Sequence, residues 1–218
     1  MNDTAVLNVV APESAARDSI ALDTPLPVGS AGKLSSGWFG LIALIVTEAA
    51  LFGYLLFAYF YLYAQNRAAW PPDGLPDLRI PVINTALLLG SSVLAWLAER
   101  AVKRGRRTAA LVWTGMAFIA GTLFALMQLG EWHKKTYDLT SHVYGSLYFT
   151  ITGFHLAHVV VGLGILLLLM AWIAFGYIEQ RRHAAFTIGV MYWHFVDAVW
   201  LAVFTSLYLT PYLFGGLS

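Results

Sequence analysis

Residues 108–130 read TAALVWTGMAFIAGTLFALMQLG, and none of these side chains carries a charge. A helix needs about 20 mostly apolar residues to cross the hydrocarbon core of a membrane. A helix of a soluble domain keeps one polar face for water, and this stretch has none. We therefore predict that residues 108–130 form a transmembrane helix.

Four more stretches have the same character, and the overall composition agrees with them. Hydrophobic residues make up 59% of the 218 residues and charged residues 11%, the mean hydropathy is +0.67, and soluble domains carry about 25% charged residues. The sequence predicts an all-α polytopic membrane protein, a bundle of five transmembrane helices within one domain, residues 34–218. The other four predicted helices are residues 36–63, 80–98, 144–177 and 186–212.

Residues 1–33 differ from the rest of the chain in being polar. They lack the basic start and short apolar run of a secretory signal, so we expect a disordered cytoplasmic tail. The chain contains no cysteine, which excludes disulfides, thiolate metal sites, iron–sulfur clusters and covalently attached haem. A net charge of +1 gives no reason to expect a nucleic acid partner.

Lysine and arginine predict the orientation, because basic flanks stay in the cytoplasm. With the N-terminus inside, nine of the thirteen basic residues fall on the cytoplasmic side and four on the far side. The C-terminus is then periplasmic. The nine are Arg17, Lys33, Arg100, Lys103, Arg104, Arg106, Arg107, Arg181 and Arg182, and the four are Arg67, Arg79, Lys134 and Lys135.

Five ionisable side chains lie within the predicted spans: Glu48, His155, His158, His194 and Asp197. A rise of 1.5 Å per residue places Glu48, His155 and Asp197 each about 16–18 Å from one membrane face, near the midplane. Charged groups at this depth cost roughly 2.5–3.5 kcal/mol, so such residues face the bundle interior or carry protons. One hypothesis is a buried polar cluster that joins the first, fourth and fifth helices, with a proton on Glu48. The alternative is a set of structural hydrogen bonds between helices.

A metal site is a further alternative, since His155 and His158 share one helix face. Membrane di-iron enzymes need many grouped histidines, and this chain has six scattered ones. We expect no metal site. The basic run of Arg100, Lys103, Arg104, Arg106 and Arg107 serves either as a topology signal or as a contact for anionic lipid head groups.

Several motifs resemble one family. The stretch YWHFVD at 192–197, continuing to Val199 and Trp200, is similar to the signature helix of subunit III of haem–copper respiratory oxidases, and GFHLAHV at 153–159 resembles the helix that precedes it. Residues 143–146, Pro81 with Asn84 and Thr85, and 128–131 are similar as well. Glu48 stands where that family keeps an intramembrane carboxylate. The similarity extends over about residues 36–212 and is to the five-helix bacterial form.

The resemblance implies a non-catalytic accessory subunit of a proton-pumping terminal oxidase in the bacterial inner membrane. It implies that subunit I, with subunit II and small subunits beside it, holds the haem and copper and reduces oxygen to water. It also implies that this chain holds structural phospholipids and supports proton uptake and stability of subunit I. Alternatives are an accessory subunit of a nitric oxide reductase and a stand-alone transporter, although the sequence shows no repeated halves.

Overall fold

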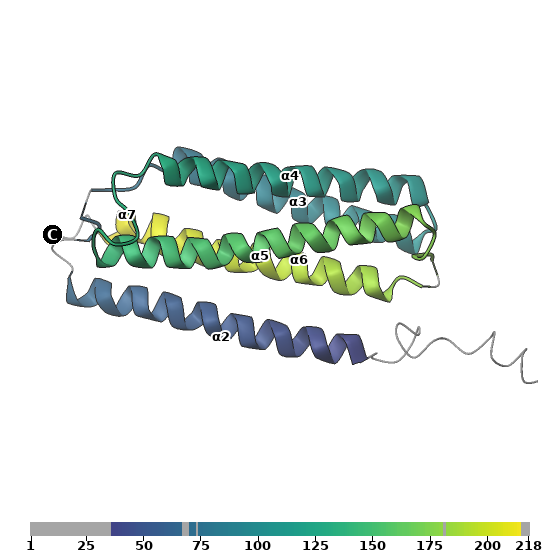
Figure 1. The fold of residues 1–218 in the computed structure, drawn as a ribbon, viewed down its shortest axis with the longest axis horizontal. Coiled ribbons are helices and arrows are strands. Elements are labelled where there is room, and N and C mark those ends of the chain that lie inside the picture. Colours follow the sequence, from purple (N-terminus) through teal and green to yellow (C-terminus); the bar gives the residue numbers. More distant parts are fainter. Residues whose placement is uncertain (1–35, 67–69, 73, 181, 215–218) are drawn as a thin grey trace, which may run out of the picture.

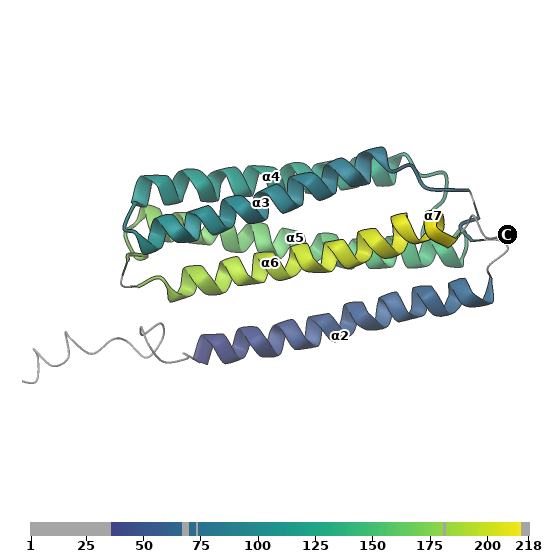
Figure 2. The same ribbon diagram turned by 180° about the vertical axis from the view of Figure 1, so that it is seen from behind.

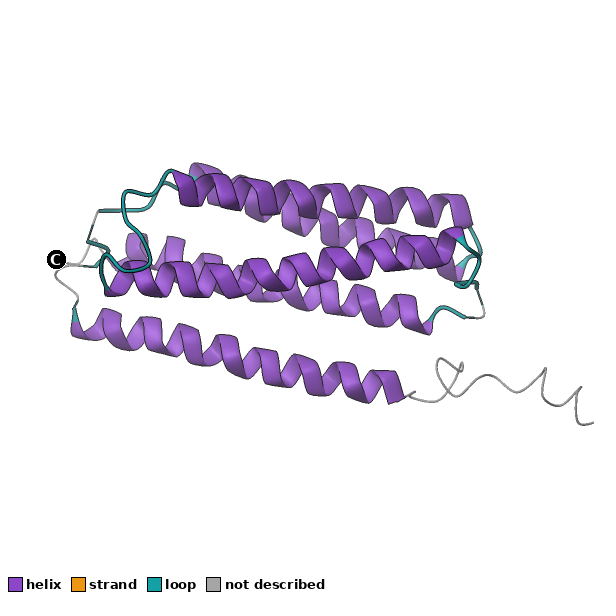
Figure 3. Cartoon of the chain, viewed as in Figure 1, coloured by secondary structure: helices purple, strands orange, loops and turns teal. Residues whose placement is uncertain are grey.

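The chain folds into long helices in a computed structural model that describes residues 36–66, 70–72, 74–180 and 182–214. The predicted tail lies outside the described residues. Within them, five helices are long and apolar enough to cross a membrane, and Figure 3 draws every regular element as helix. The predicted all-α class with five spans is confirmed. The helices are α2 (Ser36–Gln65), α3 (Arg79–Lys103), α4 (Arg107–His133), α5 (Val143–Ala174) and α6 (Ala184–Phe204).

Two helices extend further than the sequence predicted. The charged segments 99–107 and 131–142 were expected to be connections, but α3 runs to Lys103 and α4 runs to His133. Charged side chains near a helix end do not stop the helix, because they can extend toward the membrane surface. As a result, Glu99 and Glu131 are helical residues.

The turns at one end of the bundle are short because each contains a glycine in the left-handed conformation. Gly105 has φ +67° after α3, and Gly176 has φ +79° after α5. In the first turn Arg106 N–H donates to the carbonyl of Ala101 and Gly105 N–H to that of Val102, which is the Schellman pattern of helix ends. These turns bring α3 against α4 and α5 against α6.

Helices α3 to α6 form a four-helix bundle, and α2 lies outside it. α3 packs against α4 and α6, and α5 packs against α4 and α6. α2 contacts only α5 and α6 at more than a few points among the described residues, and Figure 1 shows it as a separate rod along the bundle. The outer face of α2 is apolar and exposed, as a lipid-facing helix requires.

The centre of the bundle is built around Trp193, which is fully buried. A Cβ atom on Gly121 of α4 would lie 2.6 Å from its ring, and one on Gly162 of α5 would lie 2.7 Å from it. Both positions therefore require glycine, the small residue that lets membrane helices approach. The indole N–H donates to Ser91 Oγ of α3 at 2.9 Å.

The last helix continues through a wider turn that the sequence did not predict. After α6, residues Thr205–Leu209 form a π-helical turn, labelled η2, and α7 (Thr210–Phe214) follows. The extra residue in the turn changes which side chains face the bundle, and π turns are frequent at functional sites. Here the turn carries Tyr208, which is fully buried.

Candidate functional site

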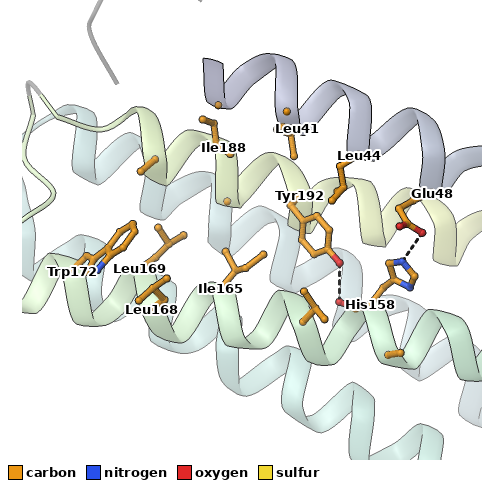
Figure 4. A pocket seen from close by; sticks show the side chains of 16 residues that line it. Leu41, Leu44, Glu48, His158, Ile165, Leu168, Leu169, Trp172, Ile188 and Tyr192 are labelled. Atoms are coloured by element: carbon orange, nitrogen blue, oxygen red, sulfur yellow. Dashed lines mark hydrogen bonds and ion pairs between the residues drawn. The ribbon is translucent and has the colours of Figure 1, made fainter. Parts of the chain in front are cut away.

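Glu48 of α2 and His158 of α5 form an ion pair or hydrogen bond across the interface between these two helices. The Oε2 atom of Glu48 lies 3.0 Å from Nε2 of His158. The side chains are 28% and 16% exposed, so neither is sealed inside the protein. The ring of Phe52 stands edge-on to the imidazole, with centroids 5.2 Å apart. Figure 4 shows the pair at one end of a pocket.

The second nitrogen of His158 defines how the pair can hold a proton. Nδ1 lies 2.7 Å from the carbonyl oxygen of Phe154. A carbonyl oxygen only accepts hydrogen bonds, so Nδ1 must carry a proton and Nε2 is the atom that can lose one. A single proton between Glu48 and His158 then sits on either partner, giving a neutral pair or an ion pair. The arrangement can accept and release a proton without rearranging the helices.

The pair closes one end of an apolar groove between α2, α5 and α6, with a volume of about 610 Å³. Apart from Glu48 and His158, its walls are hydrophobic side chains and glycines, with Trp172 toward the turn between α5 and α6. Tyr192 lines the groove and donates a hydrogen bond to the carbonyl of His158 at 3.4 Å. Figure 4 shows the side chains that line this groove between α2 and the helices behind it.

His155, three residues before His158, is separate from this pair. Its side chain is 1% exposed and packs among Phe52, Phe124 and Trp200, with ring centroids 5.0–6.4 Å apart. Neither ring nitrogen has a hydrogen-bond partner among the described residues. His155 therefore faces the bundle core, while His158 faces α2.

His194 and Asp197 form a second polar group, on the other side of α6. Ser92 of α3 donates a hydrogen bond to Oδ2 of Asp197, and its Oγ lies 2.7 Å from Nδ1 of His194. No hydrogen bond of the described residues joins this group to Glu48. The single cluster that the sequence suggested is thus divided into two hydrogen-bonded groups, with His155 apart from both. Position along a helix predicts the depth of a side chain but not the direction in which it points. The sequence did not identify Ser92 as part of this group, because serine is common in transmembrane helices.

A third polar group, which the sequence did not predict, lies at the opposite end of the bundle from the glycine turns. Oε1 of Glu131 accepts hydrogen bonds from Tyr208 at 2.9 Å and Tyr148 at 3.2 Å, and Nζ of Lys135 is 3.2 Å from the same atom. Glu131 is 5% exposed and both tyrosines are buried. It was missed because residue 131 was assigned to a loop.

The five basic residues in and beside the turn between α3 and α4 are exposed, and three of them have contacts of their own. Arg100 stacks over Trp96 at 3.5 Å, Lys103 pairs with Glu99 at 2.7 Å, and Arg107 donates to the carbonyl of Ala174. Arg104 follows the last residue of α3, and Arg106 precedes α4. All five lie at the same end of the bundle as Trp172 and the turn between α5 and α6.

Metal ligands do not gather in the part of the chain that the structure describes. No three histidine, aspartate or glutamate side chains there lie close enough to hold a metal ion. The polar groups instead pair across helices, two or three side chains at a time.

Five membrane-length helices with polar groups paired between them define a polytopic α-helical membrane protein. A family model described as Cytochrome c oxidase subunit III matches residues 31–212. Proteins named cytochrome c oxidase subunit 3 from the ostrich Struthio camelus and the cyanobacterium Synechocystis sp. are each 32% identical to this chain. The alignments cover 78% of this chain and 68% and 74% of those relatives. One from Heterololigo bleekeri is 33% identical over 81% of this chain and 71% of its own length.

The chain therefore belongs to the cytochrome c oxidase subunit III family, and the resemblance predicted from its motifs is confirmed. As a member it is an accessory subunit of a cytochrome c oxidase complex, and partner subunits accompany it.

Proposed function

We propose that this subunit is non-catalytic and serves a proton-pumping haem–copper oxidase of a bacterial inner membrane. Oxygen reduction takes place in subunit I, which this chain contacts directly, and haem and copper belong to partner subunits. The N-terminus is cytoplasmic and the C-terminus periplasmic. The exposed basic residues of the turn between α3 and α4 support this orientation, because basic flanks remain in the cytoplasm.

The proposed role in proton uptake rests on one observation, the Glu48–His158 pair. Oε2 of Glu48 lies 3.0 Å from Nε2 of His158, close enough for the two side chains to share one proton. Both side chains are partly exposed at the end of the groove. A buried structural pair is usually surrounded by further hydrogen-bond donors, whereas this carboxylate has a single hydrogen-bond partner among the described residues. The pair is thus arranged to exchange a proton with the uptake route of the partner subunit.

Phospholipid binding is the second proposed role. The groove offers apolar walls to acyl chains. At the same membrane end, Arg104 and Arg106 are exposed and available to phosphate head groups. Bound lipid there would hold α2 against α5 and α6 and stabilise the contact with the catalytic subunit.

The test is purification of the native complex in mild detergent, followed by replacement of Glu48 with glutamine. The wild-type chain should co-purify with a haem-bearing subunit that reduces oxygen. Glu48→Gln should assemble normally but pump fewer protons per electron or lose activity faster during turnover, because glutamine keeps the shape and cannot release a proton. Glu179→Gln, at the exposed turn between α5 and α6, is the matched control and should behave as wild type.

Three results would contradict the proposal. A complex that reduces nitric oxide and not oxygen would assign the chain to a reductase. A haem-free monomer active in transport would assign it to another class. Unchanged pumping and lifetime in Glu48→Gln would leave the carboxylate with a structural role only.

A further inference from the structure

The contact between α3 and α6 is held by polar side chains at regular intervals. Trp200 donates to Thr85 at 2.9 Å, Ser92 bonds His194 and Asp197, and Thr187 donates to Glu99 at 2.8 Å. The three α3 residues are seven apart, the spacing that keeps one helix facing another over a long distance. We call these residues the α3–α6 seam: Thr85, Ser92, Glu99, Thr187, His194, Asp197 and Trp200.

The seam borders the outer surface of the bundle. Ser92 and His194 are half-buried, in contrast to the neighbouring Ser91 and Trp193, which are enclosed in the core. Around them Leu89 is 41% exposed, Val93 57% and Leu201 40%. Figure 2 shows α3 and α6 side by side on the face of the bundle turned toward the viewer, away from α4 and α5.

Two polar atoms of the seam have no partner among the described residues. Asp197 is 3% exposed, and its Oδ1, which is enclosed beneath the surface, accepts no hydrogen bond. Nε2 of His194 also has none, although Nδ1 is bonded to Ser92. Both residues lie near the middle of α6, at a depth where acyl chains offer no hydrogen-bonding group. Lipid is therefore a poor cover for this surface, and protein is a good one.

We propose that the α3–α6 seam is the surface on which a transmembrane helix of the partner oxidase subunit docks. The docking helix places a hydrogen-bond donor, such as a serine, threonine, asparagine or tyrosine side chain, at mid-membrane depth opposite Nε2 of His194. The exposed Ala198 beside them is small enough to let a second helix approach closely. The inference rests on the proposed role as an accessory subunit and adds which face meets the partner.

The exposed surface of α4 is the internal comparison. Val112, Ile119 and Leu126 are 52%, 59% and 60% exposed and form an apolar stripe along that helix. Acyl chains satisfy such a stripe fully, because it has no polar atom to pair. We expect this face to meet lipid in the assembled complex.

Photo-crosslinking in the assembled oxidase tests the assignment without disturbing the seam. A photoreactive phenylalanine derivative is placed at Val93 or Leu201, beside the seam, and at Ile119 as the control. Val93 and Leu201 should give crosslinks to a larger partner chain, and Ile119 should give crosslinks to lipid. These sites are already exposed, so the fold should tolerate the larger side chain.

Contrary outcomes separate this inference from the proposed function. Partner crosslinks from Ile119 alone, or only lipid or a second copy of this chain at Val93 and Leu201, would overturn the docking surface while leaving the subunit role intact. A chain that purifies without any partner would overturn both. As a second measurement, His194→Phe should dissociate from the purified complex about threefold to tenfold faster, the range that one lost intramembrane hydrogen bond gives. Unchanged dissociation, with the variant folded, would count against the donor opposite His194.

Discussion

Glu48 and Glu131 are both glutamates on membrane helices, yet they differ in burial, in the number of their hydrogen-bond partners and in the helices that they join. Glu131 is 5% exposed and receives two tyrosine hydroxyls and a lysine on one oxygen. Glu48 is 28% exposed and has one partner, His158, at the end of an open groove. The first carboxylate joins α4, α5 and η2, whereas the second joins only α2 and α5.

The difference separates a structural carboxylate from an exchangeable one. A buried acid with several donors is held in place, and removing it leaves those donors without a partner. A partly exposed acid with one partner contributes little to folding, because a single hydrogen bond inside a membrane is modest in strength. We therefore expect Glu131 to matter for stability and Glu48 for proton exchange.

The largest effect is expected from Glu131→Ala. This change leaves Lys135 without its carboxylate and leaves the hydroxyls of Tyr148 and Tyr208 with only each other, 2.9 Å apart, so it should lower the stability of the subunit by about 3–5 kcal/mol. Thermal unfolding of the purified complex in detergent would measure the loss, with Glu179→Ala as the control. A variant as stable as wild type would show that the network does not hold these helices together.

Tyr208→Phe removes a single hydroxyl from the same network and should cost about 1–2 kcal/mol. Glu131 keeps Tyr148 and Lys135 as partners, so the effect should be clearly smaller than that of Glu131→Ala. The same unfolding measurement applies. If the two variants were equally unstable, Tyr208 would be essential to the π turn and not merely one donor among three.

Glu48→Gln should change stability by less than about 1 kcal/mol, since glutamine retains a hydrogen bond to His158 and intramembrane hydrogen bonds are individually modest. Measuring the thermal unfolding of Glu48→Gln beside that of Glu131→Ala tests directly whether the two glutamates differ in their contribution to stability. Unfolding of Glu48→Gln as severe as that of Glu131→Ala would place both glutamates in the structural class.

The smallest expected effect is the coupling between Glu48 and His158. A double-mutant cycle with Glu48→Gln and His158→Phe should give an interaction free energy near 0.6 kcal/mol, about the average for hydrogen bonds inside membranes. A coupling of several kcal/mol would indicate a dry, strongly held ion pair and contradict the open groove.

The sequence predicts well which stretches form the membrane helices and poorly which way their side chains point. It gave five spans and placed Glu48, His155 and Asp197 at similar depths, because charge and length alone determine these features. It could not tell that His155 is enclosed among aromatic rings whereas His158, three residues later, reaches Glu48. Helix α5 is hydrophobic around its whole circumference, so no polar stripe marks an outer face.

Two further features, the end of α4 and the polar residues of α3 in the seam, were not predicted from the sequence, each for a physical reason. The predicted span ended before Glu131 because charges were taken to end a helix, although α4 continues to His133. Serine and threonine are common in membrane helices, so the seam residues Ser92 and Thr85 do not individually indicate a contact with another helix. Their seven-residue spacing to Glu99 is a signal that could have shown that one face of α3 meets another helix.

Infrared difference spectroscopy of the assembled complex tests the exchangeable proton on the Glu48–His158 pair most directly. After a pH jump, wild type should show a carboxyl band that shifts promptly when water is replaced by heavy water. The band should be absent from Glu48→Gln and present in Glu179→Gln. Identical spectra of wild type and Glu48→Gln, or a band that heavy water does not reach, would contradict the account.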